Sequence, residues 1–187
     1  MNFSIIELLG AIIGLVFIIL EYRASSWLWV AGIVMSLFYI YIWYQENCMA
    51  WAMIYLYYLG ANIYGVVVWL KNSNKSSNSG ISNLPRKYYL PLSIIIVFFT
   101  CILYFILKNY TKTDIPISES FSTALSVVGM WLLAKKYLQH WNIWMVVNPI
   151  TALGSLYIGL YFTAILFTIC FIISILGFVH WRKLAGK

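Results

Sequence analysis

An amide and a proline stand side by side within an apolar run, in the stretch 141–151, which reads WNIWMVVNPIT. An unpartnered amide in hydrocarbon is costly, and a proline inside a helix removes one backbone hydrogen bond. Because Pro149 has no N–H to donate, the carbonyl of Met145 is freed near the Asn148 side chain. These two groups predict a polar wall that contacts a substrate, with Trp144 one turn earlier to stack on it. The alternative is a hydrogen bond between helices at a structural kink.

A second candidate site lies on the apolar run 49–70. Large aromatic residues, one amide and one glycine recur there at intervals of three and four, which puts them on one helical face: Trp51, Tyr55, Tyr58, Asn62, Gly65 and Trp69. We predict that Tyr58 and Asn62 contact a flat aromatic substrate, with helix packing as the open alternative. Trp69 and its counterpart Trp181 precede basic residues, so we expect them in the aromatic belts at the membrane surface.

Small residues form another face on the run 118–134. Ser122, Ser126 and Gly129 lie at helical spacing there and favour the close approach of a neighbouring helix. Ser126 and Trp131 are further candidates for substrate contact. For Ser126 close packing is the alternative.

Groups that usually carry enzyme chemistry are missing from the apolar runs. No ionisable side chain lies near the centre of a run, no Gly-rich loop is suited to a phosphate, and no His, Cys and Asp residues have metal-ligand spacing. The three cysteines, Cys48, Cys101 and Cys170, are interpreted as packing residues. We therefore predict no catalytic residue, no metal ligand and no cofactor, and a protein that is not an enzyme.

The composition of the chain indicates whether these residues lie in water or in a lipid bilayer. Only 9% of the 187 residues are charged, against roughly 25% in soluble domains, and the mean hydropathy is +0.87. A bilayer core of about 30 Å needs about 20 helical residues. The sequence therefore predicts an all-α integral membrane protein with seven transmembrane helices, near residues 3–21, 27–44, 49–70, 88–107, 118–134, 141–160 and 161–181.

The basic residues predict the orientation of these helices. Of the twelve Lys and Arg residues, ten fall on the side that receives the C-terminus and two, Lys108 and Lys112, on the other. This bias places the C-terminus in the cytoplasm and the N-terminus outside, and it argues against a nucleic-acid partner. The polar segment 71–87 is predicted to be a flexible cytoplasmic loop that buries no apolar surface.

The chain also matches itself at an offset of 112 residues. The matched pairs are Glu7 with Glu119, Trp29 with Trp141, Ala52 with Ala164, Gly65 with Gly177, Trp69 with Trp181 and Lys71 with Lys183. We predict a duplication, with a first three-helix repeat in 1–70, a linker and connector helix in 71–117 and a second repeat in 118–187. Such a 3+1+3 arrangement of parallel repeats occurs in transporters, with the substrate site near the midplane.

Several motifs together resemble the PnuC family of bacterial vitamin transporters. They are W-x-x-W-x-x-x-N (Trp141, Trp144 and Asn148), FSTALSVVGMWLLAKK (121–136), GLYFTAIL (159–166) and G-x-x-x-W (Gly177 and Trp181). The resemblance implies a fold like a full-length relative of the SWEET sugar transporters, assembled as a homotrimer in the inner membrane. It further implies facilitated diffusion of an unphosphorylated vitamin precursor, which a cytoplasmic kinase then traps.

The resemblance leaves the vitamin open. Nicotinamide riboside is the first expectation and thiamine the alternative, because both are flat aromatic cations suited to tryptophan and tyrosine faces. Met130 and the Asn148-Pro149 pair depart from the pattern of nicotinamide riboside members, which keeps thiamine in view. A hypothesis of another class is a non-transporting membrane sensor or assembly subunit, which would need a docking surface in a loop or tail.

Overall fold

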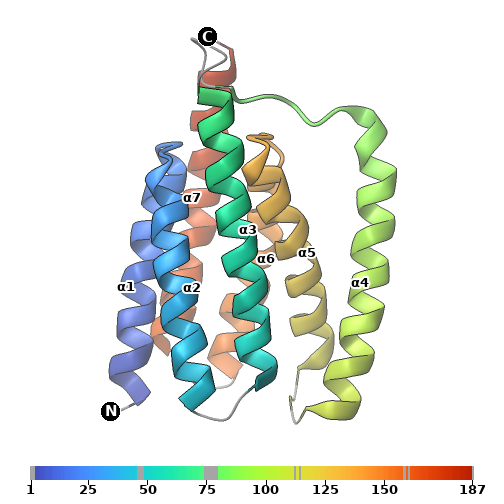
Figure 1. The fold of residues 1–187 in the computed structure, drawn as a ribbon. Coiled ribbons are helices and arrows are strands. Elements are labelled where there is room, and N and C mark those ends of the chain that lie inside the picture. Colours follow the sequence, from blue (N-terminus) through green and yellow to red (C-terminus); the bar gives the residue numbers. More distant parts are fainter. Residues whose placement is uncertain are drawn as a thin grey trace. The chain divides into compact units, whose positions relative to one another are not determined.

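The predicted apolar runs fold as helices in both halves of the chain (Figure 1). The computed structural model describes residues 3–45, 49–73, 80–111, 113, 115–157, 159 and 161–186, which divide into two compact units, 1–78 and 79–187. Within these residues the helices are α1 (Phe3–Tyr22), α2 (Trp27–Gln45), α3 (Met49–Ser73), η1 (Arg86–Tyr88), α4 (Tyr89–Tyr110), α5 (Pro116–Ala134), α6 (His140–Tyr157) and α7 (Tyr161–Ala185). The prediction of an all-helical chain is confirmed.

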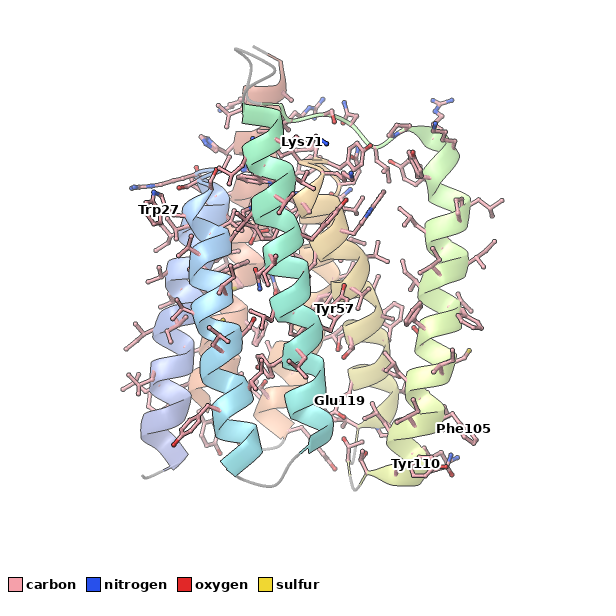
Figure 2. All side chains as sticks on the ribbon, viewed as in Figure 1. Trp27, Tyr57, Lys71, Phe105, Tyr110 and Glu119 are labelled. Atoms are coloured by element: carbon pink, nitrogen blue, oxygen red, sulfur yellow. The ribbon has the colours of Figure 1, made fainter. Side chains whose placement is uncertain are left out.

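By length and apolarity alone, three stretches of the described residues are suited to crossing a bilayer. They are Arg86–Tyr110, Pro116–Ala134 and Tyr161–Ala185, while Leu8–Tyr22 and Trp27–Leu37 are shorter apolar helices. None of the α4 residues is buried within the chain, and in Figure 2 Phe105 and Tyr110 project from it, 63% and 79% exposed. An apolar helix with this exposure suits hydrocarbon rather than water.

In the first unit, α2 lies between α1 and α3 in the order of contacts. At the start of α2, Trp29 packs edge-on against Trp69 of α3, with ring centroids 5.6 Å apart and an angle of 84°. Gly65 provides the space, because a Cβ there would lie 2.4 Å from the Trp29 ring. Trp29 and Trp69 are almost completely buried.

The second unit contains the same arrangement between α6 and α7. Trp141 packs edge-on against Trp181 at 5.8 Å and 85°, and a Cβ on Gly177 would lie 2.6 Å from the Trp141 ring. His140 lies 4.6 Å from both indole rings and its Nδ1 is 2.7 Å from the Tyr137 carbonyl.

The expected place of Trp69 and Trp181 in a membrane-surface belt is wrong. Their exposed fractions are 2% and 0%, because each glycine one turn earlier opens a space that a tryptophan of the neighbouring helix fills. At that end of the first unit the exposed tryptophan is Trp27, at 69% (Figure 2).

The offset of 112 residues also relates helix bounds and turns. The α3 bounds map onto those of α7 without a difference, and those of α1 and α2 map within one residue onto α5 and α6. The turns after α1 and α5 both contain a non-glycine residue with positive φ, Ala24 at 50° and Lys136 at 54°. In each, its N–H donates to a carbonyl three residues earlier, on Glu21 and Leu133, at 2.9 Å. Burial lowers the pKa of Lys136.

One part of the 71–87 segment contradicts the prediction that it buries no apolar surface. Ile81 and Leu84 are 8% and 7% exposed. Ser82 forms a short parallel bridge with the turn after α5, accepting from the Leu138 N–H at 2.9 Å and donating to the Lys136 carbonyl at 3.1 Å. We name residues 81–84 the linker anchor. The composition of the segment does not predict this anchor, because two apolar side chains among Ser and Asn are enough to dock four residues.

Gln139 fastens this linker anchor. Its Oε1 accepts from the Leu84 N–H at 2.7 Å and its Nε2 donates to Asn83 Oδ1 at 3.2 Å. Leu84 itself lies in an apolar cluster with Val128 and Leu132 of α5. The side chain of one glutamine therefore holds the linker to the turn between α5 and α6.

Gln139→Ala is expected to release the linker anchor and speed trypsin cleavage at Arg86 and Lys87 by about thirtyfold, since two hydrogen bonds of about 1 kcal/mol each are lost. Limited proteolysis of the purified protein measures this rate. Asn142→Ala, an exposed position on α6, is the control and should leave the rate unchanged. An unchanged rate for Gln139→Ala would mean that the buried Ile81 and Leu84 and the Ser82 bridge hold the segment without the glutamine.

Candidate functional site

Asn148 lies on α6, the helix that contacts both α5 and α7 in the second unit. Its side chain is 4% exposed, and its Nδ2 donates to Ser174 Oγ of α7 at 3.0 Å. Ser174 Oγ in turn donates to the Cys170 carbonyl at 2.7 Å. Asn148 thus makes the interhelical hydrogen bond that was its alternative interpretation. This bond uses only one of its two amide N–H groups, so substrate contact stays a prediction.

The helix α6 continues through Pro149 from His140 to Tyr157. The proline ring carries no N–H, so the Met145 carbonyl receives no bond from it. Close to this point, Thr151 Oγ1 donates to the Val147 carbonyl at 3.0 Å. The middle of α6 therefore combines a buried amide, one released carbonyl and a hydroxyl turned back onto its own helix.

Trp144 lies one turn before Asn148 but contacts a different neighbour. A Cβ on Gly129 of α5 would lie 3.4 Å from the Trp144 ring and 3.0 Å from Ile143, so the absence of a side chain at Gly129 admits these two residues. Ser126, on the same face of α5, is buried and donates to the Ser122 carbonyl at 2.8 Å. The predicted close approach of a neighbouring helix is confirmed at Gly129.

Trp131, another predicted substrate contact, lies among aromatic residues at the end of α5. Its ring centroid is 6.0 Å from Tyr88, which precedes α4, and 6.0 Å from Tyr137 in the turn after α5. It also packs against the cluster that contains Leu84. These contacts place it beside the linker anchor, while Trp144 packs at Gly129.

The predicted contacts of the first unit lie on α3. Asn62 is 3% exposed; its Nδ2 donates to the Tyr58 carbonyl at 2.8 Å and, in a longer contact of 3.4 Å, to Ser36 Oγ of α2. Its Oδ1 is enclosed and has no hydrogen-bond partner among the described residues, and a Cβ on Gly32 would lie 2.1 Å from it.

The Tyr58 ring lies against two other tyrosines of α3. Its centroid is 5.8 Å from that of Tyr55 and 5.6 Å from that of Tyr57. The side chain of Trp51 on the same predicted face lies outside the described residues. The aromatic face predicted from spacing is therefore present at Tyr55 and Tyr58, and its role in binding stays a prediction.

Other chemistry is limited in the described part of the chain. No group of three His, Cys, Asp or Glu side chains there is arranged to hold a metal ion. Cys101 is exposed and Cys170 is buried, and Cys48 lies outside the described residues.

The sequence did not lead us to predict Ser36 as a hydrogen-bond partner of Asn62. Ser36 accepts from Asn62, while Ser174 accepts from Asn148. The offset of 112 maps Ser36 onto Asn148 and Asn62 onto Ser174, so the two units contain the same amide–hydroxyl pair with the residues exchanged between helices. The self-match of the sequence contains this signal in its differing residues, and not in the identical ones.

Three comparisons relate the chain to known proteins. The family model described as "Nicotinamide mononucleotide transporter" matches residues 4–183. The nicotinamide riboside transporter PnuC of Escherichia coli (strain K12) is 22% identical over 211 residues, covering 100% of this chain and 88% of the relative, and the protein of the same name from Shigella flexneri gives the same values. The crystal structure of the vitamin B3 transporter PnuC superposes with a TM-score of 0.72 at 18% identity, covering 95% of this chain and 80% of that one.

Proposed function

This chain belongs to the nicotinamide mononucleotide transporter family, and we propose that it is a passive facilitator for an unphosphorylated vitamin precursor, with nicotinamide riboside first and thiamine as the alternative. As a member of this family it is a multi-pass membrane transporter and not an enzyme. We place it in the inner membrane, with the N-terminus outside and the C-terminus in the cytoplasm, on the strength of the ten-to-two distribution of Lys and Arg.

The observation that carries the choice of an unphosphorylated solute is the position of the cations. Among the described residues, every Lys and Arg lies between helices, in η1 or in the last turn of a helix, as Lys71, Lys108 and Arg182 do. A phosphate group passing the middle of these helices would meet no cation from the chain, and an unpaired charge in a medium of low dielectric constant is very unfavourable. A cytoplasmic kinase that adds phosphate would therefore trap the solute inside.

We assign Trp144 and Asn148 as the principal substrate contacts. An indole face attracts a flat aromatic cation by stacking and by cation–π attraction, and an amide orients it by hydrogen bonding. Their positions one turn apart on α6, where Asn148 is buried and Trp144 is half-buried, support this assignment. Tyr58 and Asn62 in the first unit, and Ser126 and Trp131 in the second, stay predicted contacts.

We also propose the 3+1+3 arrangement, with α1–α3 and α5–α7 as parallel repeats and α4 as the connector, resembling the full-length SWEET fold. The coincidence of helix bounds and turn geometry at the offset of 112 supports it. The homotrimer is proposed from the family resemblance, and the exposed apolar face of α4 is available for lipid or for another subunit.

Binding of the free vitamin alone is the test of this function. The detergent-purified protein should melt at a higher temperature with nicotinamide riboside or with thiamine. At a ligand concentration of 100 Kd, binding stabilises the folded state by about 2.7 kcal/mol. The matched phosphate ester should give no shift, because no Lys or Arg in the middle of the described helices can pair with its phosphate. Riboflavin and its phosphate complete the panel.

Uptake then separates transport from sensing. Proteoliposomes that contain the protein should equilibrate the vitamin that gave the melting shift, and an enclosed kinase should convert this equilibration into accumulation. Binding without equilibration would support the sensor or assembly subunit. An equal shift with the phosphate ester would exclude trapping as the mechanism.

A further inference from the structure

The hydrogen bonds around Ser174 determine how the Asn148 amide is turned. A serine hydroxyl has one proton, and that of Ser174 is directed to the Cys170 carbonyl at 2.7 Å. Towards Asn148, at 3.0 Å, the hydroxyl oxygen can then only accept, so the amide must present an N–H. The reversed amide would bring two acceptor oxygens together in a buried place, which is unfavourable. The oxygen Oδ1 of Asn148 is therefore turned away from Ser174.

The first unit contains the same bonding with the residues exchanged. Ser36 donates to the Gly32 carbonyl at 2.8 Å and accepts from Asn62 at 3.4 Å. In both units a serine thus donates to the carbonyl four residues earlier on its own helix and accepts from an amide on the neighbouring helix. This repetition supports the proton positions assigned to Ser174.

The exchange includes a third position. At the offset of 112, Gly32, Ser36 and Asn62 map onto Trp144, Asn148 and Ser174. Asn62 requires glycine at 32, because a Cβ there would lie 2.1 Å from its oxygen. Ser174 is smaller than Asn62, and position 144 holds a tryptophan whose indole packs at Gly129 of α5. The second unit therefore has a tryptophan one turn before its amide, whereas the first has Tyr58 there and encloses its amide oxygen against a glycine.

We infer that Ser174 is a positioning residue that turns Asn148 so that its amide oxygen is presented to the solute. This inference rests on the proposed function of Asn148 as a substrate contact. No described residue donates to Asn148 Oδ1, which leaves it available as an acceptor. The group that it recognises is then an N–H donor on an aromatic ring, such as a carboxamide or an amino group.

Matched ligands test this inference on the wild-type protein. Acetylpyridine riboside replaces the carboxamide nitrogen of nicotinamide riboside by a methyl group, and a desamino analogue of thiamine replaces the amino group by hydrogen. Whichever vitamin binds should bind about tenfold more tightly than its analogue, because one buried hydrogen bond to the amide oxygen is lost. Equal affinities for the vitamin and its analogue would overturn the inference.

Ser174→Ala tests the positioning itself. Without the hydroxyl the amide can turn either way, so the preference for the vitamin over its analogue should fall from about tenfold to about twofold. A structural role alone would lower the melting temperature and weaken both ligands equally, leaving this ratio unchanged, which would overturn the inference. Ser174→Thr keeps the hydroxyl and should keep the ratio.

Thr168→Ala is the matched control on the same helix. Thr168 also donates to a carbonyl four residues earlier, on Ala164, at 2.8 Å, but its side chain is exposed. The ratio should not change in this variant. If the wild-type protein binds none of the three vitamins, the proposed function fails and the inference with it. If it binds one but Ser174→Ala keeps the tenfold ratio, the inference alone fails.

Discussion

Gly177→Ala is expected to lower the melting temperature of the purified protein by about 10 °C, from about 3 kcal/mol of overpacking. The added Cβ would lie 2.6 Å from the Trp141 ring, nearer than such atoms approach. Trp141 has no exposed surface and lies against the rings of His140 and Trp181, so it has little freedom to move aside. Thermal unfolding of the detergent-purified variant, followed by tryptophan fluorescence, measures the loss.

Gly65→Ala in the first unit should have a similar effect, because its Cβ would lie 2.4 Å from Trp29. Gly60 provides the control on the same helix. No atom lies within 4 Å of a Cβ built there, so Gly60→Ala should leave stability unchanged or raise it by up to about 1 kcal/mol through the helix propensity of alanine. A similar loss for Gly60→Ala would mean that backbone flexibility, and not the contact with tryptophan, explains the glycines.

Helix positions were predictable because a membrane helix is encoded by the length of its apolar run. The expected segment 161–181 begins at the first residue of α7, and 49–70 begins at the first residue of α3. The expected end of the sixth segment at 160 was three residues late, since α6 ends at Tyr157. Gly159, with a φ of 82°, lies in the turn that follows. Apolar composition does not mark such a turn, because Ile158 and Leu160 continue the run.

Contacts between distant segments were less predictable. Leu84 and Gln139 are joined by a hydrogen bond across 55 residues, and nothing in the composition of 71–87 indicates a partner. The inward direction of Trp69 was detectable in principle. A glycine one turn before a tryptophan, repeated at Gly177 and Trp181, leaves a hole that only a bulky neighbour fills. The nearby basic residues led instead to the prediction that Trp69 lies at the membrane surface.

At the candidate site, too, the sequence indicated which residues matter but not which residues they contact. Both buried amides were singled out from sequence because an amide in hydrocarbon needs a partner. Their partners, Ser36 and Ser174, are small residues whose importance depends on the helix opposite, and only the exchange of Ser and Asn at the offset of 112 residues indicates it. Trp144 and Asn148 were expected to share one face, but they contact α5 and α7 respectively, because α6 lies between those two helices.

Asn148→Ala is expected to reduce vitamin uptake into proteoliposomes at least tenfold, since the variant loses the amide oxygen that we assign to the solute. The protein should still fold. The Ser174 hydroxyl proton keeps its bond to the Cys170 carbonyl, so no buried donor is left unpaired on α7. The loss of one interhelical hydrogen bond in a membrane protein averages about 0.6 kcal/mol, which corresponds to a melting shift of only about 2 °C.

Asn109→Ala distinguishes the role of this amide from that of amides in general. Asn109 is exposed at the end of α4, where its Nδ2 donates to the Phe105 carbonyl at 2.7 Å, and its loss should leave uptake unchanged. A structural Asn148 would give the opposite pattern, with a lower melting temperature but full uptake per folded molecule. In that event the amide serves only to hold α6 against α7, and the assignment of Asn148 as a substrate contact is wrong.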